Sequence, residues 1–189
     1  MRVIAGKFRG RKLKSPPTLE TRPTSDRLRE TLFNVIAPRM NGARFLDLCA
    51  GSGAVGIEAL SRAAAHVTLV DNSRKMGHLI QANLDLCRIG EVQAAVVIVD
   101  AAEFLRRRLK RSGEPWSLIY FDPPYGDDYL PTLQLLGRNA NELLDKGGLL
   151  IVEHHHKNDL AEVFDSLRRS RVLKQGDSVL SFYEKGEPA

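Results

Sequence analysis

The stretch that decides the fold is RFLDLCAGSGAVGIEALSRA, residues 44–63. Residues 44–48 are typical of a short buried strand, and residues 54–63 are typical of a helix. Between them, residues 51–56 spell G-x-G-x-x-G, in which glycines let backbone N–H groups approach a ligand at the N-terminus of a helix. A tight turn alone would also use glycines. The order of strand, glycine loop and helix nevertheless favours a nucleotide-binding unit.

Strands and helices alternate on both sides of this unit. An amphipathic helix is expected to open near Thr24, with an apolar stripe at Leu28, Leu32, Val35 and Ile36. Further strands are expected at residues 66–71, 94–100, 117–122 and 148–154, further helices at 73–90, 101–113, 130–145 and 159–170, and a closing hairpin at 171–175 and 179–185. This alternation predicts an α/β fold with a doubly wound, mostly parallel sheet.

Acidic residues end four of the expected strands. Asp47, Asp71, Asp100 and Asp122 stand at or near the carboxyl ends, where doubly wound sheets bind their ligands. Carboxylates gathered on one rim repel one another, so their placement indicates a binding site rather than a stabilising feature. Asp71 follows the glycine loop by about 20 residues, the position of an acid that binds ribose hydroxyls.

Two cofactors fit the glycine loop. A dinucleotide would place its pyrophosphate at the helix N-terminus, where Asp47 would repel it. S-adenosylmethionine carries an ammonium and a sulfonium but no phosphate, so carboxylates favour it. Asp71 would then accept the ribose hydroxyls, and Asp100 would lie at the adenine edge. The residues of the loop and strand ends expected to contact this cofactor are Asp47, Ala50, Gly51, Ser52, Gly53, Asp71, Asn72, Asp100 and Ala101.

The fourth expected strand runs into the sequence DPPY, residues 122–125. Prolines carry no N–H and cannot extend a sheet, yet a plain turn needs neither a carboxylate nor an aromatic ring. During methyl transfer to the exocyclic amino group of a nucleobase, Asp122 and the carbonyl of Pro123 would accept the two amino hydrogens. Pro123 and Pro124 would hold that carbonyl rigidly, and Tyr125 would stack on the base. Catalysis would then depend on positioning and electrostatics.

Positive charge is concentrated near the N-terminus. The chain has 28 Lys and Arg against 23 Asp and Glu, a formal net charge of +5. Basic residues precede the first acid, Glu20, and alternate with apolar residues as on a small β-hairpin. Arg9, Arg11, Lys12 and Lys14 are therefore expected to contact the phosphates of a nucleic acid.

A Pro-rich linker, residues 15–23, separates this basic hairpin from the remaining sequence. We therefore expect a hairpin-and-linker unit at residues 1–23 and a catalytic domain at residues 24–189, with a hairpin that projects from the sheet without disturbing the core. A second basic run, at residues 106–111, is expected to be a solvated helix face.

Other features point to a cytoplasmic chain without a membrane partner. No apolar run approaches the roughly 20 residues that span a bilayer, and the N-terminus lacks the apolar core of a secretory signal. Two cysteines form neither a disulfide framework nor a zinc pattern. Residues 154–156, three histidines, are expected to be a solvated strand terminus rather than a metal site. Nothing in the sequence indicates an oligomer, so a monomer is expected.

Several motifs together resemble a known family. DPPY with DLCAGSGAVGIEALSR resembles the class I amino-methyltransferases that act on nucleic acids. The stretches RVIAGKFRGRKLKSP, RPTSDRLRETLFNVI and VEHH narrow the resemblance to the bacterial small-subunit ribosomal RNA guanine-N2 methyltransferases of the RsmD type. The resemblance extends from Arg2 to about Glu184. DPPY is shared with DNA amino-methyltransferases, so the N-terminal stretches are the more specific part.

This resemblance implies a Rossmann-like sheet of seven strands, of which the last is antiparallel. It implies S-adenosylmethionine as methyl donor and one guanine of 16S rRNA, in a small-subunit particle, as target. It also implies that Arg22 and Thr24, of the sequence RPT, fold back over the cofactor.

Three alternatives remain open from the residues. A DNA amino-methyltransferase acting on adenine N6 or cytosine N4 would use the same DPPY sequence. An NAD-dependent oxidoreductase would use the same glycine loop, but the chain shows no second domain for its substrate, and DPPY would have no role. A nucleic-acid-binding protein without activity would keep the basic hairpin but would not need Asp122 and Tyr125 together.

Overall fold

The computed structural model describes residues 1–16, 25–111, 113–124 and 128–186. The helices are α1 (Asp26–Ile36), η1 (Ala37–Arg39, a 3-10 helix), α2 (Ala54–Ser61), α3 (Arg74–Cys87), α4 (Ala101–Leu109), α5 (Leu130–Arg138) and α6 (Ala140–Leu143). The strands are β1 (Arg44–Leu48), β2 (His66–Asp71), β3 (Ala94–Ile98), β4 (Trp116–Phe121), β5 (Leu144–His155), β6 (Val163–Phe164), β7 (Leu167–Gln175) and β8 (Ser178–Lys185). Within these ranges no helix has the length and hydropathy needed to cross a bilayer.

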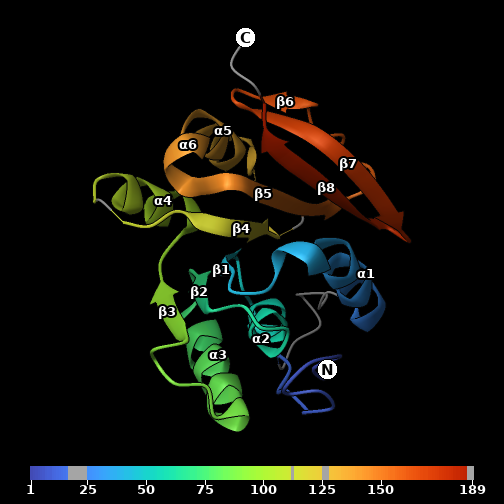
Figure 1. Cartoon of the computed structure of the whole chain (residues 1–189), viewed down its shortest axis with the longest axis vertical. Helices are drawn as coiled ribbons and strands as arrows, with labels where there is room; N and C mark the ends of the chain where they lie inside the picture. Colours follow the sequence, from blue (N-terminus) through green and yellow to red (C-terminus); the bar gives the residue numbers. More distant parts are fainter. Residues whose placement is uncertain (17–24, 112, 125–127, 187–189) are drawn as a thin grey trace.

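One sheet runs through the whole molecule, in the order β3-β2-β1-β4-β5-β8-β7-β6 (Figure 1). Strands β1 to β5 pair in parallel, whereas β8, β7 and β6 join the sheet in antiparallel fashion. This arrangement confirms the predicted doubly wound, mostly parallel α/β sheet. Among the described residues the sheet has eight strands rather than seven, because the C-terminal region adds the short strand β6.

The helix expected at residues 159–170 is wrong. Leu160, Phe164 and Leu167 are spaced as on one face of a helix, but the chain turns back at Asp165, which has a left-handed φ of 53°. Phe164 pairs with Leu167 across this turn, and the Ser166 hydroxyl donates to the carbonyl of Gly137 on α5 at 2.6 Å. All three apolar side chains are buried. Packing against α5 and pairing with β8 therefore replace the helix that the spacing suggested.

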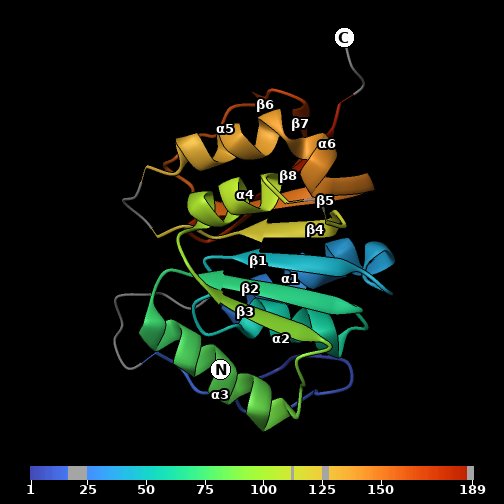
Figure 2. The same cartoon turned by 90° about the vertical axis from the view of Figure 1, so that its left-hand side faces the viewer.

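Helices cover both faces of the sheet (Figure 2). Residues of α1, α2 and α3 pack with one apolar cluster, and residues of α4, α5 and α6 pack with the other. Alternate residues of a strand enter opposite clusters: Phe45 of β1 joins the first and Leu46 the second. This period of two is the pattern that a sheet buried on both faces requires.

The N-terminal segment, residues 1–16, packs against the body of the protein beside α2 (Figure 1). Its antiparallel pairing is a single bridge between Arg2 and Lys12. Val3, Phe8 and Leu13 are buried in the cluster that contains α1, α2 and α3. The expectation that a basic hairpin would project from the sheet without involving the core is therefore wrong, because these apolar side chains alternate with the basic ones and are buried.

Candidate active site

A pocket of about 590 Å³ lies at the carboxyl ends of the parallel strands. Its lining includes Asp47, Asp71, Asp100 and Asp122, so the structure brings together the four acids that the sequence predicted would converge. Cys49 lies among them. Burial, and then the charges of these four carboxylates, raise the pKa of its thiol, so Cys49 stays protonated and is not a nucleophile.

The glycine loop forms one side of this pocket. Asp71, at the end of β2, accepts the Gly51 N–H at 2.8 Å with one oxygen and the Ser73 N–H at 2.9 Å with the other. Gly53 caps α2 in a left-handed conformation, φ 75°, that favours glycine. Ala50, Gly51 and Ser52 line the pocket. The carboxylate predicted to bind ribose therefore also holds the loop in place.

Asp47 is the most buried of the four acids, with 1% of its surface exposed. One of its oxygens accepts the N–H of Gly56, in the first turn of α2, at 3.0 Å. Burial raises the pKa of Asp47 to about 7, assisted by the nearby charge of Asp71 and opposed by the Gly56 hydrogen bond. Asp47 therefore changes its charge near neutral pH, and a cation in the pocket would favour the ionised form.

Asp100 and the residues near it form the far side of the cofactor region. The Asp100 side chain accepts the N–H of Glu103 at 3.1 Å and caps α4. Ala101, the first residue of α4, and Asn72, which follows β2, also line the pocket. The structure thus places these predicted cofactor residues around the same cavity as the glycine loop.

The residues predicted for catalysis form the other half of the pocket. Asp122, Pro123 and Pro124 directly follow β4 and line the cavity. The Asp122 N–H donates to the carbonyl of Leu48 at 3.3 Å, which ties the start of this turn to the end of β1. Arg22, Thr24 and Tyr125, the other predicted site residues, lie outside the residues that the structure describes.

Sequence reasoning missed a buried acid beside Asp122. Glu153, on β5, is 4% exposed and lines the pocket together with Tyr120. Its carboxylate accepts hydrogen bonds from the hydroxyls of Tyr120 and, at 3.1 Å, Ser178. The signal was present, since an acid interrupts the apolar run of residues 149–152 at the end of a strand next to β4. A buried carboxylate needs such partners, so this network fixes the ends of β4, β5 and β8 relative to one another.

Other residues of the lining also escaped prediction. Tyr129 and Thr132 line the side of the pocket nearest α5, and Tyr129 meets Phe121 edge-on with ring centroids 6.3 Å apart. Met1 and Pro16 line the pocket from the N-terminal segment. None of these belongs to a recognisable motif, and only the folded chain places them beside the acids.

The basic residues predicted to contact nucleic acid divide into two kinds. Arg9, Arg11, Lys12 and Lys14 are all exposed. Arg11, however, donates to the carbonyl of Leu86, near the C-terminus of α3, at 2.7 Å. Arg11 therefore fastens the N-terminal segment to α3, whereas Arg9 and Lys12 present their charges to solvent.

The three consecutive histidines do not form a uniform solvated terminus. His154 is 4% exposed, and its Nε2 lies 2.9 Å from the hydroxyl of Ser181. The rings of His155 and His156 lie 4.4 Å apart, and together with Asp177 they offer ligand atoms within 4.8 Å of one another. The Nδ1 atom of His155 already accepts the N–H of Lys157 at 3.1 Å. A metal-bound histidine normally donates its second N–H, so this hydrogen bond disfavours a metal site.

Comparisons with known proteins agree with this geometry. A family model described as Conserved hypothetical protein 95 matches residues 1–184. The chain is 40% identical over 178 residues to Ribosomal RNA small subunit methyltransferase D of Escherichia coli (strain K12). The match covers 93% of this chain and 86% of that protein. It is 36% identical over 185 residues to YlbH of Bacillus subtilis (strain 168), and the match covers 98% of this chain and 99% of that protein.

A solved structure shows the same fold. The Escherichia coli protein yhhF superposes with a TM-score of 0.83 at 38% identity, over 98% of this chain and 97% of that one. These matches confirm the family resemblance that the sequence motifs predicted. The chain belongs to the Conserved hypothetical protein 95 family.

Proposed function

We propose that the protein is an S-adenosylmethionine-dependent methyltransferase that modifies the exocyclic amino group, N2, of a guanine in 16S rRNA. The observation that carries this proposal is that Asp122, Pro123 and Pro124 share one pocket with Asp47, Asp71 and Asp100. A cationic nucleoside cofactor and an amino group presented to a carboxylate fit that arrangement. The relative named Ribosomal RNA small subunit methyltransferase D supports ribosomal RNA as the substrate.

The cofactor half of the pocket matches the chemistry of S-adenosylmethionine. Asp71 retains lone pairs for ribose hydroxyls after accepting the Gly51 and Ser73 N–H groups. Asp47, once ionised, favours the positive charge of the methionine portion. When bound, S-adenosylmethionine supplies an electrophilic methyl group on a sulfonium.

The target half of the pocket orients the guanine amino group. The lone pair of that nitrogen is delocalised into the ring, so acceptors that hold its two hydrogens must turn it toward the methyl group. The Asp122 carboxylate and the Pro123 carbonyl take these roles. The new bond forms between N2 and the methyl carbon, the carbon–sulfur bond breaks, and the amino proton leaves to solvent. The enzyme supplies orientation and electrostatic stabilisation, without a strong base.

The substrate is an assembled small-subunit particle in the cytoplasm, and the protein acts as a monomer. Residues 1–16 serve the cofactor pocket through Met1 and Pro16 and face the substrate through their exposed basic residues. In this arrangement Arg9, Lys12 and Lys14 contact phosphates around the target guanine. Arg22, Thr24 and Tyr125 complete the cofactor and base sites.

Methyl transfer from labelled S-adenosylmethionine tests the proposal. Three substrates are tested in parallel: duplex DNA, protein-free 16S rRNA, and small-subunit particles from Escherichia coli cells that lack Ribosomal RNA small subunit methyltransferase D. The methylated nucleosides are identified by mass spectrometry. We expect N2-methylguanosine, formed most rapidly in particles. N6-methyladenine or N4-methylcytosine in the DNA would instead favour a DNA amino-methyltransferase. Binding of NADH without binding of S-adenosylmethionine would contradict the proposal altogether.

A further inference from the structure

Asn83, on the inner face of α3, is fully buried and makes three hydrogen bonds. Its amide nitrogen donates to the carbonyl of Ser52 at 2.9 Å and to the carbonyl of Lys14 at 3.0 Å. Its amide oxygen accepts the N–H of Lys14 at 2.8 Å. One side chain therefore joins the glycine loop to the end of the N-terminal segment.

A polar residue at this position needs a reason other than helix stability. Asparagine is a weaker helix former than leucine or alanine, and a buried amide costs free energy unless it is hydrogen-bonded. Asn83 uses both of its donors and its acceptor on backbone groups of other segments. If Asn83 were apolar, the carbonyl of Ser52 and the N–H and carbonyl of Lys14 would lose these hydrogen-bond partners.

The two ends of the N-terminal segment reach the cofactor region. Met1 and Pro16 line the same pocket as Ser52. The Ser52 hydroxyl also donates to the sulfur of Met1 at 3.6 Å. The segment that carries the exposed basic residues thus also lines the pocket, and Ser52 is linked to Met1 directly and to Lys14 through Asn83.

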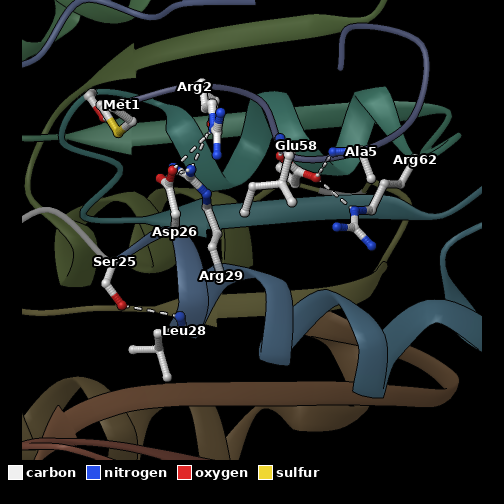
Figure 3. Close-up of polar contacts among 11 residues, drawn as sticks. Met1, Arg2, Ala5, Ser25, Asp26, Leu28, Arg29, Glu58 and Arg62 are labelled. Carbon is white, nitrogen blue, oxygen red and sulfur yellow. Dashed lines mark hydrogen bonds and ion pairs between the residues drawn. The ribbon is translucent and has the colours of Figure 1, made fainter. Parts of the chain in front are cut away.

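A second set of buried groups holds the middle of the segment (Figure 3). Glu58, on α2, accepts the N–H groups of Ile4 at 2.7 Å and Ala5 at 3.0 Å. Arg29, on α1, donates to the carbonyl of Arg2 at 2.7 Å. Both Glu58 and Arg29 are fully buried. These contacts hold the segment on α1 and α2, whereas Asn83 and the Ser52–Met1 hydrogen bond join it to the glycine loop.

We propose that Asn83 is a positioning residue that holds the glycine loop against the N-terminal segment. Residues 1–16 would then form a wall of the cofactor pocket that contributes to ligand binding. The inference rests on the proposed function, because it concerns S-adenosylmethionine and its product. Loss of the Asn83 amide should free the Ser52 carbonyl and the end of the segment to move apart, which loosens the pocket that Met1, Pro16 and Ser52 line.

The test compares Asn83→Ala with Asn139→Ala. Asn139 also donates its amide to a backbone carbonyl, that of Leu135 at 2.8 Å, but it does not line the pocket. Binding of S-adenosylhomocysteine is measured calorimetrically below the unfolding temperature of every variant. We expect Asn83→Ala to weaken binding roughly tenfold or more, from the loss of buried hydrogen bonds, and Asn139→Ala to leave it unchanged.

Hydrogen exchange supplies a readout that a merely structural role would not change. In the wild-type protein, S-adenosylhomocysteine should slow amide exchange within residues 1–16, and in Asn83→Ala this ligand-dependent protection should disappear. The wild-type measurement tests the segment's role even if Asn83→Ala does not fold. Unchanged affinity with protection retained in Asn83→Ala, or no protection of residues 1–16 in the wild type, would overturn the inference. A wild-type protein that binds no S-adenosylhomocysteine would instead contradict the proposed function, and this inference with it.

Discussion

The two halves of the pocket use carboxylates differently. In the cofactor half, each acid holds the backbone that forms the site: Asp71 binds Gly51 and Ser73, and Asp47 binds Gly56. In the target half, the turn that carries Asp122 follows β4 and contains two prolines, and the Asp122 N–H donates to the carbonyl of Leu48 at 3.3 Å. We therefore expect cofactor affinity and stability to be coupled in the first half, whereas turnover should be separable from cofactor affinity in the second.

The largest expected effect is on turnover in Asp122→Ala. This change removes an acceptor for the target amino group, so we expect kcat to fall roughly 100-fold to 1,000-fold. S-adenosylhomocysteine affinity should change little, because the Asp122 carboxylate is assigned to the target amino group and not to the cofactor. Single-turnover methyl transfer and calorimetry measure the two properties separately.

Asp159→Ala is the matched control, because the Asp159 side chain is 98% exposed and lies outside the pocket lining. Turnover in Asp122→Ala close to that of this control would remove the catalytic role of Asp122. A large loss of cofactor affinity in Asp122→Ala would instead erase the distinction between the two halves.

The next effect is expected in Asp71→Ala, which should lose affinity and stability together. The change removes a ribose acceptor and leaves the Gly51 and Ser73 N–H groups without their partner. We expect S-adenosylhomocysteine to bind roughly tenfold more weakly or worse, and the free energy of unfolding to fall by about 1–3 kcal/mol. Asp71→Asn, which keeps one acceptor oxygen, should lose less of both. If affinity fell with no loss of stability, the coupling inferred for this half would be wrong.

Asp47 predicts a pH dependence of stability in the protein without cofactor. Its pKa is raised to about 7 in the fold, so the folded protein retains a proton that the unfolded chain releases near its ordinary value of 3.8. The contribution of this group to stability is therefore largest below that ordinary pKa. It declines as the pH rises, until the folded-state pKa is passed.

Denaturant unfolding of wild type and Asp47→Asn between pH 4 and 8 measures this contribution. As the pH rises, the unfolding free energy of the wild type should fall relative to that of Asp47→Asn. S-adenosylmethionine should bind the wild type more tightly above neutral pH. A difference that is independent of pH would show that Asp47 is ionised throughout.

The smallest effect is expected from the basic residues outside the pocket. Replacement of Arg9 and Lys12 by alanine should leave stability and cofactor binding nearly unchanged, since exposed charges contribute little to folding. If both contact phosphates, the log–log salt dependence of RNA binding should flatten by about 1.4–1.8.

Arg11→Ala provides the internal comparison, because Arg11 binds the Leu86 carbonyl and its loss should lower thermal stability. Titrations of particle binding at several salt concentrations measure the slopes. Equal slopes for the wild type and the Arg9 and Lys12 double variant would mean that these residues form a solvated face and that RNA binds elsewhere.

Local sequence patterns predicted the geometry of the glycine loop and of the strand ends well. The glycine loop requires glycine at the left-handed Gly53, and parallel strands bring their carboxyl ends to one rim, so the acids at those ends had to meet. The failures lie where tertiary contacts outweigh local spacing. The spacing of Leu160, Phe164 and Leu167 also fits a helix, and only their packing and strand pairing in the fold favour two strands and a turn.

The parallel sheet, the glycine loop and the meeting of the four strand-end acids were predictable from local patterns. Each depends on residues close in the chain or on the common polarity of parallel strands. Tertiary contacts alone place Glu153 beside the turn that carries Asp122 and place the basic N-terminal segment at the pocket. Asn83 meets Lys14 across 69 positions and Ser52 across 31. No local pattern encodes such contacts, because a buried amide is placed by the packing of whole helices and is recognisable only from the backbone groups that it satisfies.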